Sequence, residues 1–342
     1  MAGNPTLKNI QALRLLAAAL VFLQHAYFFA SQTVGDNAIE FRKFNLGGLG
    51  VYIFFIISGF FIALQTEKKS EAFAGHRLAR IYPAYFIALV VSTAIFYLFS
   101  DFRPSFSDAA SLLLLPTGTL NSSFQIPYWT LIYGMYFYTL ILLLMALTRA
   151  RPSLINSALL LWLVSIITAS HNGIKVNLPS PDYFSILLSP LNIYFITGFF
   201  LARFSLSGNQ TAARLAFLVV GFELVFYAEL RYILSICVFG AMVLIFITQL
   251  KPLPAVLNRL GNYSYGIYLL HLPIIYCLYL ALKSAGASFT TSLLVMTLVA
   301  LPIAIGFGKF EYWLYQKKIR PAVDRFLSRK ASPQLNQPLE QP

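Results

Sequence analysis

The segment KNIQALRLLAAALVFLQH, from Lys8 to His25, decides the fold because it places Arg14 and His25 inside an apolar run long enough to cross a membrane. In an α-helix this spacing brings both side chains to one face, about 16 Å apart along the axis. An ionisable side chain in a bilayer costs at least ~2.5 kcal/mol, so the pair is expected to line a polar cavity enclosed by other helices. Two plainer alternatives stay open: Arg14 snorkelling to the interface, and His25 as a packing residue.

The composition is that of an integral membrane protein. Of 342 residues, 58% are hydrophobic and 11% charged, whereas soluble domains carry about 25% charged residues. At ~20 residues per crossing, the length predicts an all-α polytopic protein with a single bundle of about ten transmembrane helices. We expect a transmembrane domain over residues 1–316 and a cytoplasmic tail over 317–342, first basic and then rich in Pro and Gln.

The positive charge is distributed in a way that indicates membrane topology. The formal net charge is +13, and 18 of the 25 Lys and Arg residues fall either in alternate connections between apolar runs or near the two ends of the chain. By the positive-inside rule this pattern places both termini in the cytoplasm. A multi-pass protein of the inner (plasma) membrane is expected, with lipid around it and no nucleic acid as a partner.

Apolar periodicity gives the approximate positions of the helices. The segment 109–116 is too short to span and reads as an interfacial or re-entrant piece. The expected helices cover about 10–30, 46–65, a third ending near 100, a fourth after 127, then 153–170, 184–204, 212–229, 231–249, a ninth from about 260 and 290–310.

Two arginines precede the third span. Arg77 and Arg80 are three residues apart and share a helical face, which suits a clamp for phosphate because each guanidinium offers forked donors. The alternative is that positive-inside topology alone places them there.

Several further polar or aromatic side chains lie within predicted spans. Ser58 follows a glycine-rich run, and Trp129 and Tyr133 belong to an aromatic cluster that suits either a sugar face or a membrane interface. The ninth helix carries Ser264, Tyr268 and His271 along one stripe, which suits a cavity wall, although hydroxyl-to-backbone bonding would also explain the first two. Glu223 needs a polar environment within its helix.

Taken together, these segments resemble the acyltransferase family 3 membrane proteins. The resemblance rests on Arg14 and His25 with ten intervening residues, GVYIFFIISGF (50–60), RLARIYP (77–83), PYWTLIYGMYFY (127–138) and LGNYSYGIYLLHLP (260–273), in matching order and spacing. The chain is most similar to the bacterial branch that O-acylates exopolysaccharide and surface glycans.

This resemblance implies transfer of an acyl group, acetyl in the first instance, from cytosolic acetyl-CoA to a hydroxyl of an exported or cell-surface polysaccharide or its lipid-linked precursor, without a metal. His25 and Arg14 match the residues that the family needs for activity, and Arg77 and Arg80 match its donor-binding pair. The remaining candidates line a cavity or bind the acceptor: Ser58, Trp129, Tyr133, Ser264, Tyr268, His271 and Glu223.

Two positions depart from the family pattern. Tyr52 and Gly134 stand where the family usually has acidic residues, so a carboxylate that orients an imidazole or a hydroxyl would have to come from elsewhere, with Glu223 and Glu311 as candidates. Two alternative functions stay open. One is a transporter or flippase in which buried Arg, His and Glu side chains form a path for a substrate or proton. The other, suggested by Tyr52 and Gly134, is a catalytically silent relative that binds glycan or lipid. The oligomeric state is not predicted.

Overall fold

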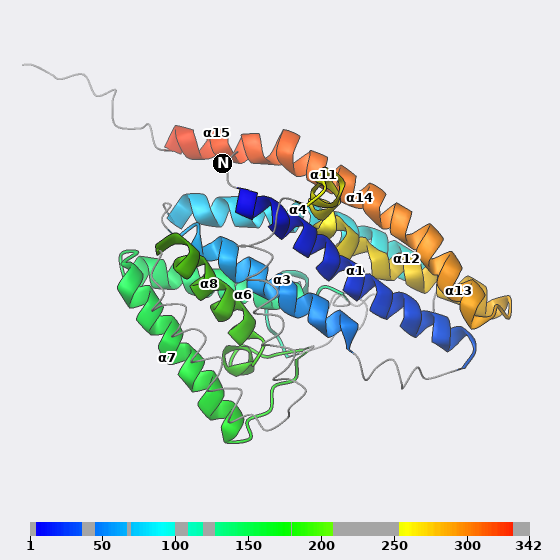
Figure 1. Cartoon of the computed structure of the whole chain (residues 1–342), viewed down its shortest axis with the longest axis horizontal. Coiled ribbons are helices and arrows are strands. Elements are labelled where there is room, and N and C mark those ends of the chain that lie inside the picture. Colours follow the sequence, from blue (N-terminus) through cyan, green and yellow to red (C-terminus); the bar gives the residue numbers. More distant parts are fainter. Residues whose placement is uncertain are drawn as a thin grey trace, which may run out of the picture.

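The computed structural model describes residues 5–35, 45–66, 70–99, 109–118, 127–178, 180–207 and 253–330. Within these ranges the chain is helical (Figure 1), and the strand-type pairing is limited to an isolated bridge between Thr117 and Asp182. Seven of the described helices are long and apolar enough to cross a membrane. The all-helical, multi-span class is thus confirmed, while the total of about ten spans and the side on which the termini lie stay predictions.

The described helices begin and end close to where hydrophobicity places them. They are α1 (Pro5–Thr33), α3 (Leu46–Ala63), α4 (Ser70–Phe99), α5 (Ala109–Leu112), α6 (Trp129–Leu147), α7 (Pro152–His171), the 3₁₀ turn η1 (Ser185–Leu188), α8 (Asn192–Ser207), α11 (Ala255–Gly261), α12 (Ser264–Ser284), α13 (Phe289–Val295), η2 (Met296–Ala300), α14 (Leu301–Leu314), η3 (Tyr315–Ile319) and α15 (Arg320–Lys330).

The prediction of one helix over 184–204 is wrong for the first part of this range. The chain forms the short turn η1, breaks, and starts α8 only at Asn192. Pro190 explains the break, because a proline disfavours helical geometry at the residue before it, and Ser189 is extended with φ −67° and ψ 130°. The expected helices over 212–229 and 231–249, with Glu223, lie outside the described residues.

The last helix is longer than its apolar run. It was expected to end near residue 310, but α13, η2, α14, η3 and α15 form one continuous helix up to Lys330, drawn in orange to red in Figure 1. Its two π-helical turns, η2 and η3, end just before Pro302 and Pro321. A proline lacks the N–H for the helical ladder and crowds the preceding turn, which a local widening relieves.

The C-terminal part of this helix supports the start of α4. Val323 and Leu327 of α15 pack where Gly75 leaves room, and His76 Nε2 lies 3.2 Å from Asp324 Oδ1. The next residue along α4 is Arg77. The long helix therefore helps to position the arginine pair.

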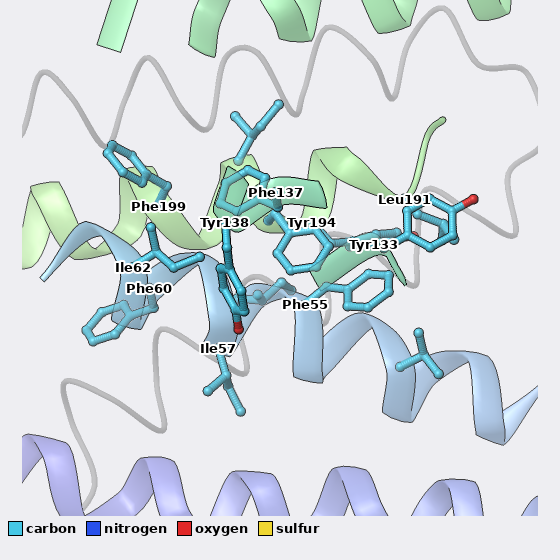
Figure 2. Packing of buried hydrophobic residues seen from close by; sticks show 14 of the residues in the cluster. Phe55, Ile57, Phe60, Ile62, Tyr133, Phe137, Tyr138, Leu191, Tyr194 and Phe199 are labelled. Carbon is cyan, nitrogen blue, oxygen red and sulfur yellow. The ribbon is translucent and has the colours of Figure 1, made fainter. Parts of the chain in front are cut away.

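Aromatic side chains fill the space between α3, α6 and α8. Figure 2 shows this packing, with Phe55 of α3 and Phe137 of α6 close to α8. Phe195 stacks on both, at ring-centroid distances of 4.3 Å from Phe55 and 4.7 Å from Phe137. These rings are buried and hold the three helices in one cluster.

Glycines bring α3 and α8 together. A Cβ atom on Gly59 would overlap the carbonyl oxygen of Phe195, and one on Gly198 would overlap that of Ile56. The backbones can therefore approach only while both positions lack a side chain, as is common where membrane helices cross.

We expect Gly198→Ala to destabilise the bundle by about 1–3 kcal/mol, because the methyl group would push α8 away from the α3 backbone. Thermal unfolding of the purified protein in detergent should show a clear fall in Tm. Gly306→Ala on α14 is the matched control, since a Cβ there meets nothing within 4 Å and alanine favours a helix. An unchanged Tm for Gly198→Ala would contradict this close packing.

Candidate functional site

Two adjoining cavities lie among α1, α3, α4, α6 and α12. We name them by their ionisable residues. The arginine cavity, of about 140 Å³, has the polar lining residues Arg14, Ser58, Arg77, Arg80, Thr130 and Tyr268. The histidine cavity, of about 360 Å³, has the polar and aromatic lining residues Gln24, His25, Asn45, Tyr52, Trp129 and Tyr268. Val51 and Tyr268 line both cavities, so they form a shared wall.

Helix α1 contributes one ionisable group to each cavity. Arg14 lines the arginine cavity and His25 lines the histidine cavity, three turns further along the same helix. Ala17 and Ala18 between them are buried against neighbouring helices. Gly50 of α3 lies so close to Ala17 that a Cβ would overlap the Ala17 carbonyl oxygen. Small residues thus allow α1 to be enclosed while its polar groups stay within the cavities.

The arginine cavity carries an excess of positive charge. Arg80 pairs with Glu311 of α14, which is 2% exposed, and its guanidinium also lies 5.0 Å from the Tyr265 ring and 4.9 Å from the Tyr315 ring. Glu311 therefore compensates the charge of Arg80 and is not the carboxylate that would orient the His25 imidazole. This contact joins the last long helix to α4.

The other two arginines have no carboxylate partner among the described residues. Arg77 lies 4.9 Å from the Tyr138 ring, and its Nε and Nη2 atoms are buried without a hydrogen-bond acceptor in the part of the chain that the structure describes. The hydrogen bond found for the Arg14 guanidinium is a long one, 3.5 Å from Nη1 to Gln11 Oε1. Unpaired guanidiniums in a low-dielectric interior favour the binding of an anion.

The imidazole of His25 borders the histidine cavity and contacts a second imidazole, that of His271. The Nδ1 atom of His25 lies 3.0 Å from the Nε2 atom of His271 on α12, and the ring centroids are 5.1 Å apart. His271 is 1% exposed, and its Nδ1 lies 2.7 Å from the Tyr268 carbonyl oxygen and 3.1 Å from that of Ile267. The polar stripe of the ninth predicted helix led us to expect His271 on a cavity wall, whereas in the structure it lies behind His25.

The shared wall is held by hydrogen bonds. The Tyr268 hydroxyl donates to the Pro127 carbonyl oxygen and lies 2.6 Å from Thr130 Oγ1. Because a phenol has one proton, Thr130 is the donor in the second bond. Tyr268 is thus fixed between the cavities.

The two positions that depart from the family pattern border different cavities. Tyr52 lines the histidine cavity and stacks on Tyr194 at 4.2 Å and 7°. Gly134 lines the arginine cavity, and a Cβ there would meet nothing within 4 Å. Neither cavity has an Asp or Glu among its described lining residues.

Other candidates from the sequence lie elsewhere. The Tyr133 ring is fully buried, with its hydroxyl donating to the Leu178 carbonyl oxygen at 3.1 Å. Ser264 is also buried, and its hydroxyl has no hydrogen-bond partner among the described residues. Neither side chain is among the residues that line the two cavities. Over the described ranges, no group of three or more His, Cys, Asp or Glu side chains could hold a metal ion.

Sequence reasoning missed two amides of the histidine cavity, Gln24 and Asn45. Asn45 begins α3, where its Oδ1 accepts from the Gly48 N–H at 3.1 Å, and its backbone is left-handed with φ 41°. The signal was present, since asparagine is a favoured N-cap before a helix. Gln24 Oε1 lies 3.4 Å from the Gly47 nitrogen, a contact between separate segments that sequence spacing does not reveal.

Comparison with known proteins agrees with the resemblance seen in the sequence. A family model described as an acyltransferase domain matches residues 7–309. The acyltransferase MdmB of Streptomyces mycarofaciens is 31% identical over 162 residues, which cover 43% of this chain and 41% of MdmB. ORF330 of Acidianus two-tailed virus, a provisionally named acetyltransferase, is 26% identical over 250 residues, or 67% of this chain and 73% of that protein. No solved structure gives a significant match.

We expect Glu311→Gln to cost about 3–5 kcal/mol of stability, because it leaves the Arg80 guanidinium buried without its carboxylate. Unfolding in detergent should therefore occur at a lower temperature or denaturant concentration. The double variant Arg80→Gln/Glu311→Gln should be less destabilised than the single variant, since it removes both charges.

Asp324→Asn is the control for this ion pair. It removes a carboxylate that is 55% exposed and pairs with His76, and it should cost no more than about 1 kcal/mol. Equal stability of Glu311→Gln and the wild type would contradict the buried pairing.

Proposed function

This chain belongs to the acyltransferase domain family identified above, and from that premise we propose that it is a membrane O-acyltransferase. In this proposal it moves an acetyl group from cytosolic acetyl-CoA to a hydroxyl of a polysaccharide or of its lipid-linked precursor, in the inner (plasma) membrane. One observation supports the proposal: a cavity lined by three arginines and a cavity lined by His25 adjoin along α1 and share the Tyr268 wall.

The arginine cavity suits the phosphate-bearing donor. Arg77 has two unpaired nitrogen donors, Arg14 lies in the same cavity, and Arg80 is balanced by Glu311. Guanidiniums bind phosphate through parallel hydrogen bonds. The remaining lining is largely apolar, which suits the uncharged arm of the coenzyme that carries the thioester. We assign donor binding to Arg77, Arg80 and Arg14.

The histidine cavity suits a carbohydrate acceptor. Trp129 and Tyr52 offer aromatic faces, and the Gln24 and Asn45 amides offer hydrogen-bond donors and acceptors. Sugars bind through this combination of apolar ring faces and directed polar contacts. We therefore place the acceptor hydroxyl beside His25.

The reaction requires one group that accepts and returns a proton. In the proposed mechanism His25 removes the proton of the acceptor hydroxyl while the oxygen attacks the thioester carbonyl carbon. The C–O bond forms, the C–S bond breaks, and the imidazolium returns the proton to the departing thiolate of coenzyme A. A neutral imidazole has a lone pair on one ring nitrogen that can accept this proton.

The names of the relatives support the reaction class. MdmB is named an acyltransferase, and ORF330 is named, provisionally, an acetyltransferase. The matched region spans less than half of MdmB but almost three quarters of ORF330. The choice of acetyl as the transferred group in our proposal therefore follows the name of ORF330.

We expect His25→Ala to lower acetyl transfer at least about 100-fold while membrane insertion is retained, because the proton acceptor is lost. The assay supplies purified protein with radiolabelled acetyl-CoA and a glycan acceptor. His171→Gln, at the end of α7, is the control that removes an imidazole outside both cavities. Full activity of His25→Ala would contradict the mechanism.

The same protein in liposomes separates the alternatives. Glycan movement without consumption of acetyl-CoA would support a transporter, and binding without either reaction would support a catalytically silent relative. Transfer that depends on both substrates is the expected result.

We expect Arg77→Met to raise the KM for acetyl-CoA about 10- to 100-fold with a smaller effect on kcat, because it removes charged hydrogen bonds to the donor phosphates. Initial rates at varied donor concentration measure this change. Arg151→Met, at the exposed start of α7, is the matched control. An unchanged KM for Arg77→Met would remove Arg77 from the donor site.

A further inference from the structure

We infer that His271 is a positioning residue that fixes the tautomer of His25, so that Nε2 of His25 is the nitrogen that acts on the acceptor hydroxyl. This inference rests on the proposed transferase function and specifies how its base is prepared. It follows from the hydrogen bonds of two imidazoles that lie 246 residues apart in sequence.

The first step concerns the proton on His271. Its Nδ1 lies 2.7 Å from the Tyr268 carbonyl oxygen and 3.1 Å from the Ile267 carbonyl oxygen. A carbonyl oxygen only accepts hydrogen bonds, so the nitrogen that faces it must carry hydrogen. Nδ1 of His271 is therefore the donor, and in the neutral ring its Nε2 is left with a lone pair.

The second step derives the position of the proton on His25 from that on His271. Nε2 of His271 lies 3.0 Å from Nδ1 of His25, and two lone pairs would repel at this distance. Nδ1 of His25 must carry the proton and donate it.

The third step gives the chemical consequence. In a neutral His25 whose Nδ1 is protonated, Nε2 carries the lone pair, and the ring borders the histidine cavity. When Nε2 takes a proton from the acceptor, the resulting imidazolium still donates from Nδ1 to His271, now through a stronger, charge-assisted bond. His271 thus takes the place that the carboxylate holds in a Ser-His-Asp triad, and the backbone carbonyls behind it fix the tautomer of His271 itself.

The backbone around His271 is held in place for this task. Pro273 has no N–H, so the Leu269 carbonyl oxygen lacks its partner in the helical ladder. The Tyr128 hydroxyl lies 3.2 Å from that oxygen and 2.7 Å from Ser92 Oγ on α4. This segment of α12 is thus tied to its neighbours on the helical turn that carries His271.

The plainer alternative is that the two imidazoles merely pack together. It predicts no fixed tautomer for His25, and any loss of activity on substitution would follow a loss of stability. A spectroscopic readout separates the two cases. The whole chain has four histidines, His25, His76, His171 and His271, so ¹⁵N-histidine labelling gives a spectrum that can be assigned.

The test is solid-state ¹⁵N NMR of the full-length protein in lipid bilayers, with His25→Ala, His76→Gln and His171→Gln used for assignment. We expect both His25 and His271 to be protonated at Nδ1 and unprotonated at Nε2 in the wild type. A wild-type His25 protonated at Nε2 would overturn the inference, whether or not any acceptor is known.

Kinetics then test the role of His271. His271→Leu removes the acceptor for Nδ1–H of His25, and we expect a mixed His25 tautomer and a kcat at least about 100-fold lower, with the KM for acetyl-CoA within about twofold of the wild type. His271→Gln offers an amide oxygen as an alternative acceptor, and we expect its kcat to be at least about tenfold higher than that of His271→Leu.

Full activity of His271→Leu would overturn the positioning role. So would a loss of activity in His271→Gln that is explained entirely by a lower Tm of that variant. Absence of transfer by the wild type with every acceptor would instead defeat the proposed function, while the wild-type NMR result would still decide the tautomer.

Discussion

The structure depends on keeping polar groups of α1 away from lipid. A guanidinium and an imidazole on one membrane helix require neighbours that supply space and polar partners, because hydrocarbon supplies neither. Ala17 and Gly50 allow α3 to approach α1, and the two cavities receive Arg14 and His25. The rest of the described bundle, from the aromatic cluster to the long last helix, encloses these two spaces.

The charge on the arginine side is only partly balanced within the protein. Glu311 compensates Arg80 and is contributed by the same long helix whose end supports the start of α4. The unpaired donors of Arg77 remain available for an anionic ligand. On the histidine side the polar groups are uncharged amides, rings and backbone carbonyls. The arginine cavity and the histidine cavity thus differ in electrostatic character although they share a wall.

Sequence periodicity predicted the described spans well, because a helix that crosses a membrane must be apolar over a known length. It also predicted that Arg14 and His25 share a helix face, since that relation is local. It could not place His271 behind His25, nor show that Glu311 contacts Arg80, because such pairs join helices far apart in sequence. The break at Ser189 was missed although Pro190 signalled it, because the apolar run continued across the proline.

Gly134 lines the arginine cavity, and a Cβ added there would meet nothing within 4 Å. The size of this cavity can therefore be altered by a small side chain at one position, with no shift of the backbone of α6. In our proposal, which places the donor in this cavity, relatives that differ at this position can differ in the bulk or charge of the thioester they admit while keeping the same scaffold. Under that proposal, donor choice is separable from folding.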